Sequence, residues 1–241
     1  MNIDFRKVNN YSHFCKPNII RMIVKNKYFL LLVISLLLST LSYGQSIQGA
    51  IAIGTNLTQV DGDEMYGFKK FGLNASAIAI MPIKKRWAIS VEASYSQKGS
   101  REYYPPEVDP TKELPYYDLR LSYAEVPIMV HFTDKGFLTV GLGMSWGRLV
   151  GMKEIEWNIQ TDASLYSGHY NRNDINGIFD LRFPIYKKLN LNFRYAYSFA
   201  KIRTREYNNL AGDSWKRDQY NNVLTLRFYY IFNERKNYSN D

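Results

Sequence analysis

The stretch LNLNFRYAYSFA, residues 189–200, decides the fold, because its apolar and polar residues alternate at every second position. Leucine, phenylalanine and tyrosine occupy the odd positions, whereas asparagine, arginine, alanine and serine occupy the even ones. Successive side chains of a β-strand point to opposite faces, so this stretch is predicted to be a strand with one apolar face. That face is too large and aromatic for a narrow barrel interior, and it suits contact with lipid.

The same alternation recurs along the rest of the chain after Gln45, without convincing helical periodicity. Residues 137–149 and 220–232 show it most clearly, with leucine, tryptophan, phenylalanine and tyrosine on one face. Eight strands are predicted, over residues 47–56, 71–83, 86–97, 118–132, 137–149, 175–186, 189–202 and 220–232.

The connections between these strands alternate between short and long. The second, fourth and sixth span a few residues each, whereas the other four are much longer. This alternation is typical of outer-membrane barrels, with tight periplasmic turns and large outer loops, and a Greek-key sandwich has no reason to show it. The fold class predicted is an all-β, eight-stranded, antiparallel up-and-down transmembrane β-barrel over residues 45–233, with both termini periplasmic. A soluble periplasmic barrel is the competing fold.

One predicted strand changes its apolar face part-way along. Leu119, Leu121 and Tyr123 occupy odd positions, whereas the apolar residues from Val126 onward occupy even ones. A β-bulge near residues 125–127 would reset the alternation, and a proline is tolerated at such a place. We therefore expect a bulge there.

The N-terminal region is predicted to be a cleaved signal peptide. An apolar run from Leu30 to Leu41 follows two lysines, and small residues precede Gln45 at the positions that signal peptidase requires. We expect the signal peptide to span residues 22–44, with residues 1–21 either a mis-assigned start or an extended n-region. Residues 234–241 form a polar tail. The single cysteine, Cys15, lies upstream, so the mature chain has no disulfide and no thiol chemistry.

Charge and hydropathy exclude two classes of protein. A mean hydropathy of −0.34 does not fit a bundle of membrane helices. The net charge is +9, but six of the 31 basic residues and one of the 22 acidic residues precede Gln45. The mature chain then carries only about +4, so a nucleic-acid partner is not expected.

Charged residues also occur on the small, polar face of the predicted strands. That face points into the lumen, where an unpaired charge is costly, so we expect these residues to pair across the barrel and close it. A proton or ion path is the functional alternative. The predicted lumen charge network consists of Glu92, Asp180, Arg182, Arg194 and Arg227.

The long connections hold the candidate contact residues. Tyrosine offers contact area for partners or ligands, and it is equally common in aromatic girdles at membrane interfaces. The segment 61–64, with the sequence DGDE, is acidic but lacks the spacing of a calcium loop, so a solvated loop or weak divalent-ion binding is expected. The candidate loop contacts are Tyr103, Tyr104, Tyr116, Tyr117 and His169.

The mature chain has two histidines as candidate catalytic residues, His131 and His169. An outer-membrane enzyme would need a histidine with a serine or aspartate near the outer rim. His131 falls near a predicted periplasmic turn, whereas His169 lies in a long loop close to Ser167 and Asp174. We expect a polar surface loop there, with a His169–Ser167 pair as a lesser alternative. No cofactor, metal-ligand cluster or phosphate-binding loop is predicted.

The mature chain resembles the PorT-like outer-membrane β-barrel proteins of Bacteroidota. The resemblance rests on YSQKG at 95–99, YAEVPI at 123–128 and GLGMSWG at 141–147, and it covers roughly residues 45–233. It implies a barrel in the cell outer membrane, whose best-known relative is required for type IX secretion. No residue of this chain is tied to secretion by it. The tail after Phe232 departs from the family pattern, in which the last strand ends in the aromatic residue that the barrel-assembly machinery reads.

The sequence therefore predicts an outer-membrane barrel with a structural or interaction role, linked to secretion or envelope assembly. A narrow porin or a ligand-binding loop platform is the alternative, and a lipid A-modifying enzyme is the third reading. The expected partners are outer-membrane lipid and lipopolysaccharide, the barrel-assembly machinery, and secretion-system or envelope proteins.

Overall fold

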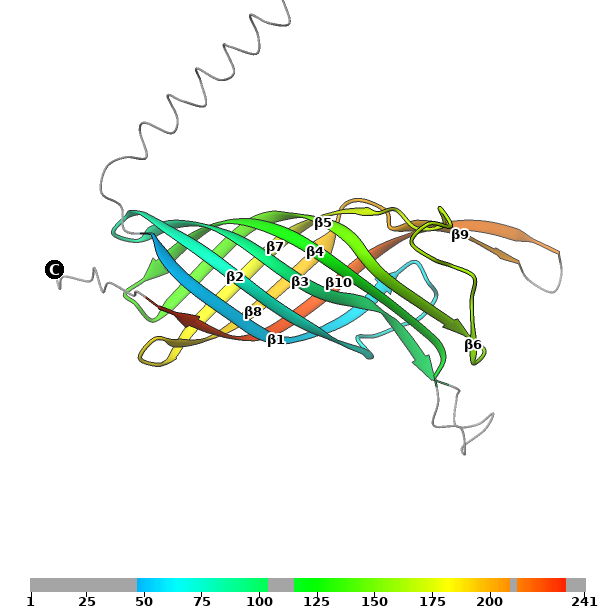
Figure 1. Cartoon of the computed structure of the whole chain (residues 1–241), viewed down its shortest axis with the longest axis horizontal. Helices are drawn as coiled ribbons and strands as arrows, with labels where there is room; N and C mark the ends of the chain where they lie inside the picture. Colours follow the sequence, from blue (N-terminus) through cyan, green and yellow to red (C-terminus); the bar gives the residue numbers. More distant parts are fainter. Residues whose placement is uncertain (1–46, 104–114, 209–211, 233–241) are drawn as a thin grey trace, which may run out of the picture. The chain divides into compact units, whose positions relative to one another are not determined.

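A single antiparallel sheet closes on itself into a barrel in the computed structural model, which describes residues 47–103, 115–208 and 212–232. The barrel strands follow the order β1-β2-β3-β4-β5-β7-β8-β10, and β10 pairs back with β1 to complete the ring (Figure 1). The described residues contain no helix with the length and apolar character needed to cross a membrane. The barrel strands are β1 (Gln48–Asp61), β2 (Lys70–Lys84), β3 (Trp87–Tyr103), β4 (Pro115–Asp134), β5 (Leu138–Glu156), β7 (Asn173–Tyr186), β8 (Leu189–Ser198) and β10 (Ser214–Ile231).

Tight turns join the strands at one end of the barrel, which we call the turn end. The turns after β2, β4 and β7 span two or three residues each, and Lys135 and Lys187 adopt positive φ values of 45° and 42° in two of them. The start of β1 and the end of β10 lie at this end too, because Ala50 pairs with Ile231. The opposite end, which carries the longer connections, is the loop end. The predicted eight-stranded up-and-down topology is thus confirmed.

The barrel wall is apolar outside and polar inside. On β10, Leu226 and Phe228 are exposed on the outer surface, whereas Arg227 between them is fully buried. The same contrast separates exposed Phe193 from buried Arg194 on β8. Side chains that face outward from a closed barrel have no partner strand to cover them, so this surface is built for lipid.

The predicted bulge in β4 is wrong. The odd-numbered residues of β4 from Tyr117 to Met129 all face the interior, and the register with β3 continues unbroken through this region. The irregularity lies in β5, where Ser122 pairs with Gly151 and Tyr123 pairs with Leu149, which leaves Val150 as an extra residue. The apolar residues change face because the interior itself becomes apolar toward the loop end.

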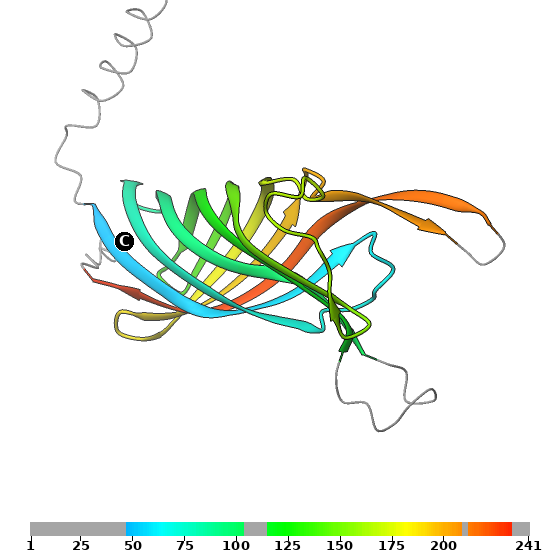
Figure 2. The same cartoon turned by 45° about the vertical axis from the view of Figure 1, so that its right-hand side comes forward.

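The sheet extends further toward the loop end than the sequence indicated. Strands β1, β3 and β5 continue for five to seven residues past their predicted ends, and β6 (Ile159–Gln160) adds a short pairing to β5. The seventh predicted strand, residues 189–202, ends at Ser198, and a strand that was not predicted, β9 (Arg203–Asn208), follows after a break over residues 199–202. Strand β9 pairs with residues 214–219 of β10, and Figure 2 shows this hairpin projecting well beyond the barrel. We call residues 203–208 and 214–219 the arm.

Candidate functional site

The centre of the barrel interior holds a cluster of two carboxylates and two guanidinium groups, contributed by four strands. Arg194 on β8 grips Glu92 on β3 with both terminal nitrogens, at 2.6 and 3.1 Å, and also contacts Asp180 on β7 at 2.8 Å. Arg227 on β10 lies 3.2 Å from Glu92. All four side chains are almost fully buried, and their formal charges sum to zero. We call these four residues the central cluster.

Neutral polar side chains supply further hydrogen bonds to the central cluster. Asn192 donates to the carboxylate of Asp180 and accepts from Nε of Arg227 at 2.8 Å. Ser76 accepts a hydrogen bond from the same guanidinium at 3.2 Å. Burying ions costs several kcal/mol each, so such a cluster persists only where pairing and hydrogen bonding are nearly complete. The arrangement fits a structural plug.

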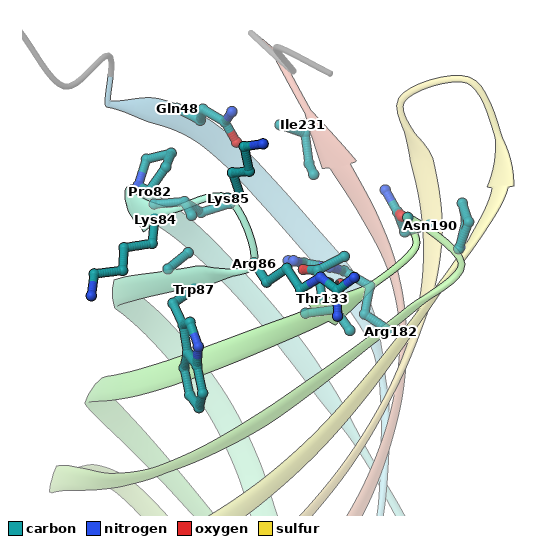
Figure 3. Close-up of a pocket in the computed structure, with 15 residues that line it drawn as sticks. Gln48, Pro82, Lys84, Lys85, Arg86, Trp87, Thr133, Arg182, Asn190 and Ile231 are labelled. Carbon is teal, nitrogen blue, oxygen red and sulfur yellow. Dashed lines mark hydrogen bonds between the residues drawn. The ribbon is translucent and has the colours of Figure 1, made fainter. Parts of the chain in front are cut away.

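Arg182, the fifth predicted member, lies apart from the central cluster. Its guanidinium sits 4.7 Å from the ring centre of Tyr229, and it lines a cavity of about 110 Å³ at the turn end. In Figure 3, Arg86 points toward Thr133 and Arg182 at the mouth of this cavity. Arg182 is only half-buried because it is two residues nearer the turn end than Asp180.

His131 also lies inside the barrel near the turn end. It is 4% exposed, and its Nε2 is 2.8 Å from the hydroxyl of Ser90. The ring fills the space beside Gly141 on the neighbouring strand, where a Cβ atom would approach within 2.6 Å. These contacts make His131 a packing residue of the barrel wall.

A second ionic layer, which was not predicted from the sequence, lies closer to the loop end. Lys98 contacts Glu125 at 2.6 Å and Asp174 at 3.0 Å, and all three are buried. Asn221 donates to Asp174 at 2.9 Å. Lys98 has the same inward parity as Glu92 on β3, so continuing the alternation past the predicted end of that strand would have found it.

An apolar layer closes the interior beyond Lys98. Its buried members include Leu119, Leu121 and Leu149, each without exposed surface. Arg203 from the arm lies 4.5 Å from the ring centre of Tyr170, a member of this layer, and pairs with Glu154 at 2.9 Å. Two ionic layers and one apolar layer therefore fill the barrel from its centre to the loop end.

The predicted loop contacts divide between the surface and the interior. Tyr117, proposed as a surface contact, is 2% exposed and donates to Glu154 at 3.2 Å, because the inward alternation of β4 reaches that far. Tyr116 stacks on Trp157 with ring centres 5.2 Å apart. Tyr103 and His169 are exposed, whereas Tyr104 lies outside the described residues.

The acidic segment 61–64 is not uniformly solvated. Asp63 is 1% exposed, and its Oδ1 accepts a hydrogen bond from the backbone of Met65 at 2.9 Å. Burial raises the pKa of Asp63 to about 6. Glu64 instead contacts the arm, through Nε1 of Trp215 at 3.2 Å. No group of three or more metal-ligating side chains occurs in the part of the chain that the structure describes.

Comparison with known proteins identifies the family. The family described as "Outer membrane protein beta-barrel domain" matches residues 43–203. This chain belongs to that family. Its members are barrels of the outer membrane, in agreement with the apolar outer wall described above. No curated protein gives a significant match to the chain.

Several solved structures share the barrel at low sequence identity. Ail, the attachment invasion locus protein of Yersinia pestis, is 16% identical with a TM-score of 0.45, over 77% of this chain and 98% of Ail. Neisserial surface protein A is 11% identical with a TM-score of 0.43, over 77% and 96%. A major outer membrane protein from Thermus thermophilus is 10% identical with a TM-score of 0.43, over 78% and 100%.

Proposed function

We propose that this outer-membrane barrel is a non-enzymatic structural or interaction protein that acts through its loop end. The observation that carries the proposal is the filled interior, in which the central cluster, the Lys98 layer and the apolar layer follow one another. An eight-stranded barrel has room for its own side chains but for no wide pore. Contacts with other molecules then fall to the outer surface, above all to the arm.

The arm suits such a role by its exposure and its anchoring. Residues 214–218 of β10 are all exposed, and β9 has no partner on its outer edge within the described residues. At its base, Arg205 pairs with Glu156 at 2.7 Å, which ties the arm to β5. A projecting hairpin with a free edge is a suitable surface for a protein partner.

The finer family assignment and the partners form part of the same proposal. The motifs at 95–99, 123–128 and 141–147 support a PorT-like protein of Bacteroidota, and with it a role in envelope assembly or secretion. The alternation of tight turns and long loops supports an orientation with both termini in the periplasm. The barrel-assembly machinery, outer-membrane lipid and envelope or secretion-system proteins are the partners we propose.

Planar-bilayer recordings of the purified, folded protein test the sealed interior. We expect no stable conductance steps, because the buried side chains of the three layers occupy the interior of a narrow barrel. A trimeric general porin, added under the same conditions, would serve as the positive control. Reproducible ohmic steps from this protein would overturn the proposal in favour of the narrow porin.

The non-enzymatic part of the proposal rests on the surroundings of the two histidines. Ser167, the candidate partner of exposed His169, donates instead to the backbone oxygen of Ser164 at 2.8 Å. Asp174, the possible third member, is buried with Lys98. Mass spectrometry of lipid A from cells with and without the protein should give identical spectra. A mass change that disappears in His169→Ala would support the enzyme instead.

A further inference from the structure

A basic groove at the loop end is lined by residues of β2, β3, β4 and β5. The groove encloses about 350 Å³, and five of its eleven lining residues are cationic while none is acidic. Lys98 and Lys70 are buried and belong to ion pairs with Asp174 and Asp118. The remaining cations, Arg101, Arg120 and Lys153, define the basic groove.

Two of these cations lie directly opposite each other. Arg120 on β4 is the cross-strand partner of Lys153 on β5, and both side chains are exposed on the outer face. Like charges at directly opposed positions destabilise a sheet unless an anion lies between them. Asp118 supplies an anion to Arg120, whereas Lys153 has no ion-pair or hydrogen-bond partner among the described residues.

A single carboxylate, that of Asp118, is the ion-pair partner of three cations at the groove. Asp118 contacts Arg120 at 2.8 Å, Arg101 at 3.4 Å and Lys70. A single negative charge therefore faces three cations, with Lys153 adding a fourth. The excess is local, because none of the described residues that line the groove carries a carboxylate, and it calls for a ligand that carries at least one further negative charge.

The groove lies at the boundary of the apolar outer wall. On β4 the exposed residues from Val130 through Val126 to Ala124 are followed by Ser122 and then Arg120. Starting from Phe132 at the turn end, the ten residues to Ser122 climb about 25 Å along a barrel axis tilted by about 40° to the strand, which is about the height of a lipid-facing apolar band. Arg120 is thus placed where lipid headgroups begin.

We propose that the basic groove binds a phosphate group of a lipid in the leaflet at the loop end, such as the phosphates of lipid A. One guanidinium group can bind two phosphate oxygens at once. The partial burial of Arg101 makes such a contact more favourable than it would be on an open surface. Phe71 and Met152 line the same groove, and they offer apolar contact to the sugar or acyl part of the lipid. The inference locates the lipid contact of the proposed function and rests on its orientation.

Binding of defined lipids to the folded protein in detergent micelles tests this inference by isothermal titration calorimetry. We expect bis-phosphorylated lipid A to bind at least 10-fold more tightly than lipid A from which both phosphates have been removed. This comparison uses the wild-type protein, so it does not depend on the folding of a variant. Equal affinity for the two lipids would overturn the proposal.

Substitutions locate the site. Arg120→Gln/Lys153→Gln should weaken binding of bis-phosphorylated lipid A at least 10-fold, whereas Arg120→Lys/Lys153→Arg should retain it. The matched control, Lys135→Gln/Lys187→Gln, removes the same charge from exposed turns at the opposite end and should change binding less than 2-fold. Folding of each variant is checked by its heat-dependent mobility on gels. Equal loss in the control pair would place the effect in overall charge and refute the groove.

Inorganic phosphate distinguishes a lipid from a soluble ligand. We expect it to compete only at millimolar concentration, because it lacks the sugar and acyl contacts. Competition at the concentration of the lipid itself would assign the groove to a free anion and overturn the lipid proposal. A sealed lumen with no preference for phosphorylated lipid would refute this inference alone, whereas conductance with intact lipid preference would refute the proposed function alone.

Discussion

The buried positive charge of Arg194 is compensated by two carboxylates. Its guanidinium is shared between Glu92 and Asp180, and it takes both oxygens of the Glu92 carboxylate. The energetic value of such a residue lies less in net attraction than in the cost of its absence, because removing one ion leaves the others buried without compensation.

Replacing Arg194 with methionine should therefore destabilise the barrel by about 3–5 kcal/mol. Only Arg227 would remain to face two buried carboxylates. Urea unfolding in phospholipid vesicles, followed by tryptophan fluorescence, measures the change. The double variant Arg194→Met/Glu92→Gln restores charge balance and should recover much of the loss. A double variant no more stable than the single one would contradict this account.

Unlike Arg194, which is buried as an ion, Asp63 lies in surroundings that favour its neutral, protonated form. Its pKa rises from 3.8 to about 6, so the folded protein binds the proton more tightly than the unfolded chain does. The contribution of Asp63 to stability is then lost as the pH rises from about 4 through 6, and the cost above pH 6 amounts to at most about 3 kcal/mol.

Asp63→Asn should stabilise the protein at pH 8 and have little effect at pH 4. Asparagine keeps the oxygen that accepts the hydrogen bond from Met65 but carries no charge. Unfolding midpoints of wild type and variant at the two pH values provide the measurement, with the exposed Asp162→Asn as the control. A larger gain at pH 4 than at pH 8 would reverse the sign and refute the assignment.

Among the elements, β3 and β4 leave no room for a side chain at Gly99. This residue has a φ of +138°, and a Cβ atom there would lie 1.9 Å from the carbonyl oxygen of Leu119. Thr58 donates to the carbonyl of Gly99 at 2.8 Å, which fixes the backbone from the other side.

Gly99→Ala should cost about 1–3 kcal/mol and loosen the loop-end half of β3. Hydrogen exchange at residues 98–103 reports the local effect, and exchange at the turn-end half of β3 should stay unchanged. Gly168→Ala is the matched control, because Gly168 also has a positive φ but no atom within 4 Å of the added Cβ. Equal effects of the two substitutions would show that conformational strain alone, rather than the contact with Leu119, is responsible.

The sequence predicted elements well where one face meets lipid and poorly where both faces are apolar. Alternation in residues 189–200 identifies β8 directly, because lipid outside and charge inside have opposite requirements. In β4, Leu119 and Leu121 face the interior while Val126 faces lipid, and these residue types are interchangeable in a hydrophobicity pattern. Hydrophobicity therefore suggested a bulge that the backbone does not contain.

The alternation of odd and even positions also predicted which charged side chains face the lumen. It did not predict which of them form ion pairs with each other. Glu92, Asp180, Arg194 and Arg227 come from four strands, and their meeting depends on the stagger between strands. Only Asp180 and Arg194 are direct cross-strand partners. The arm escaped prediction because its exposed, charged residues alternate with no apolar face, and Lys153 drew no attention because its importance comes from standing opposite Arg120.

At the scale of the whole molecule, the interior is closed by several independent layers. The central cluster, the Lys98 layer and the apolar layer around Leu119 occupy successive positions toward the loop end. Loss of one layer leaves the other two in place, so a change in conductance requires more than one of them to fail.

A fourfold variant, Glu92→Gln/Asp180→Asn/Arg194→Met/Arg227→Met, should therefore remain non-conducting in planar bilayers. The removal of all four charges leaves no uncompensated ion, so its stability should stay within about 2 kcal/mol of wild type, and replacing buried ions by neutral groups can even stabilise a protein. Stable channels in this variant alone would identify the central cluster as the sole barrier.

Strand β10 runs without interruption from the arm to the seam with β1, where Asp61 pairs with Tyr220 and Ala50 with Ile231. A partner that pulls on the arm would thus load β10 lengthwise. The hydrogen bonds of that seam, and those to β8, would share the force in shear instead of opening one after another. β9, joined to β8 only through the break at 199–202, would peel away first. In mechanical terms, force applied to the arm passes into β10. The same strand closes the barrel by pairing with β1.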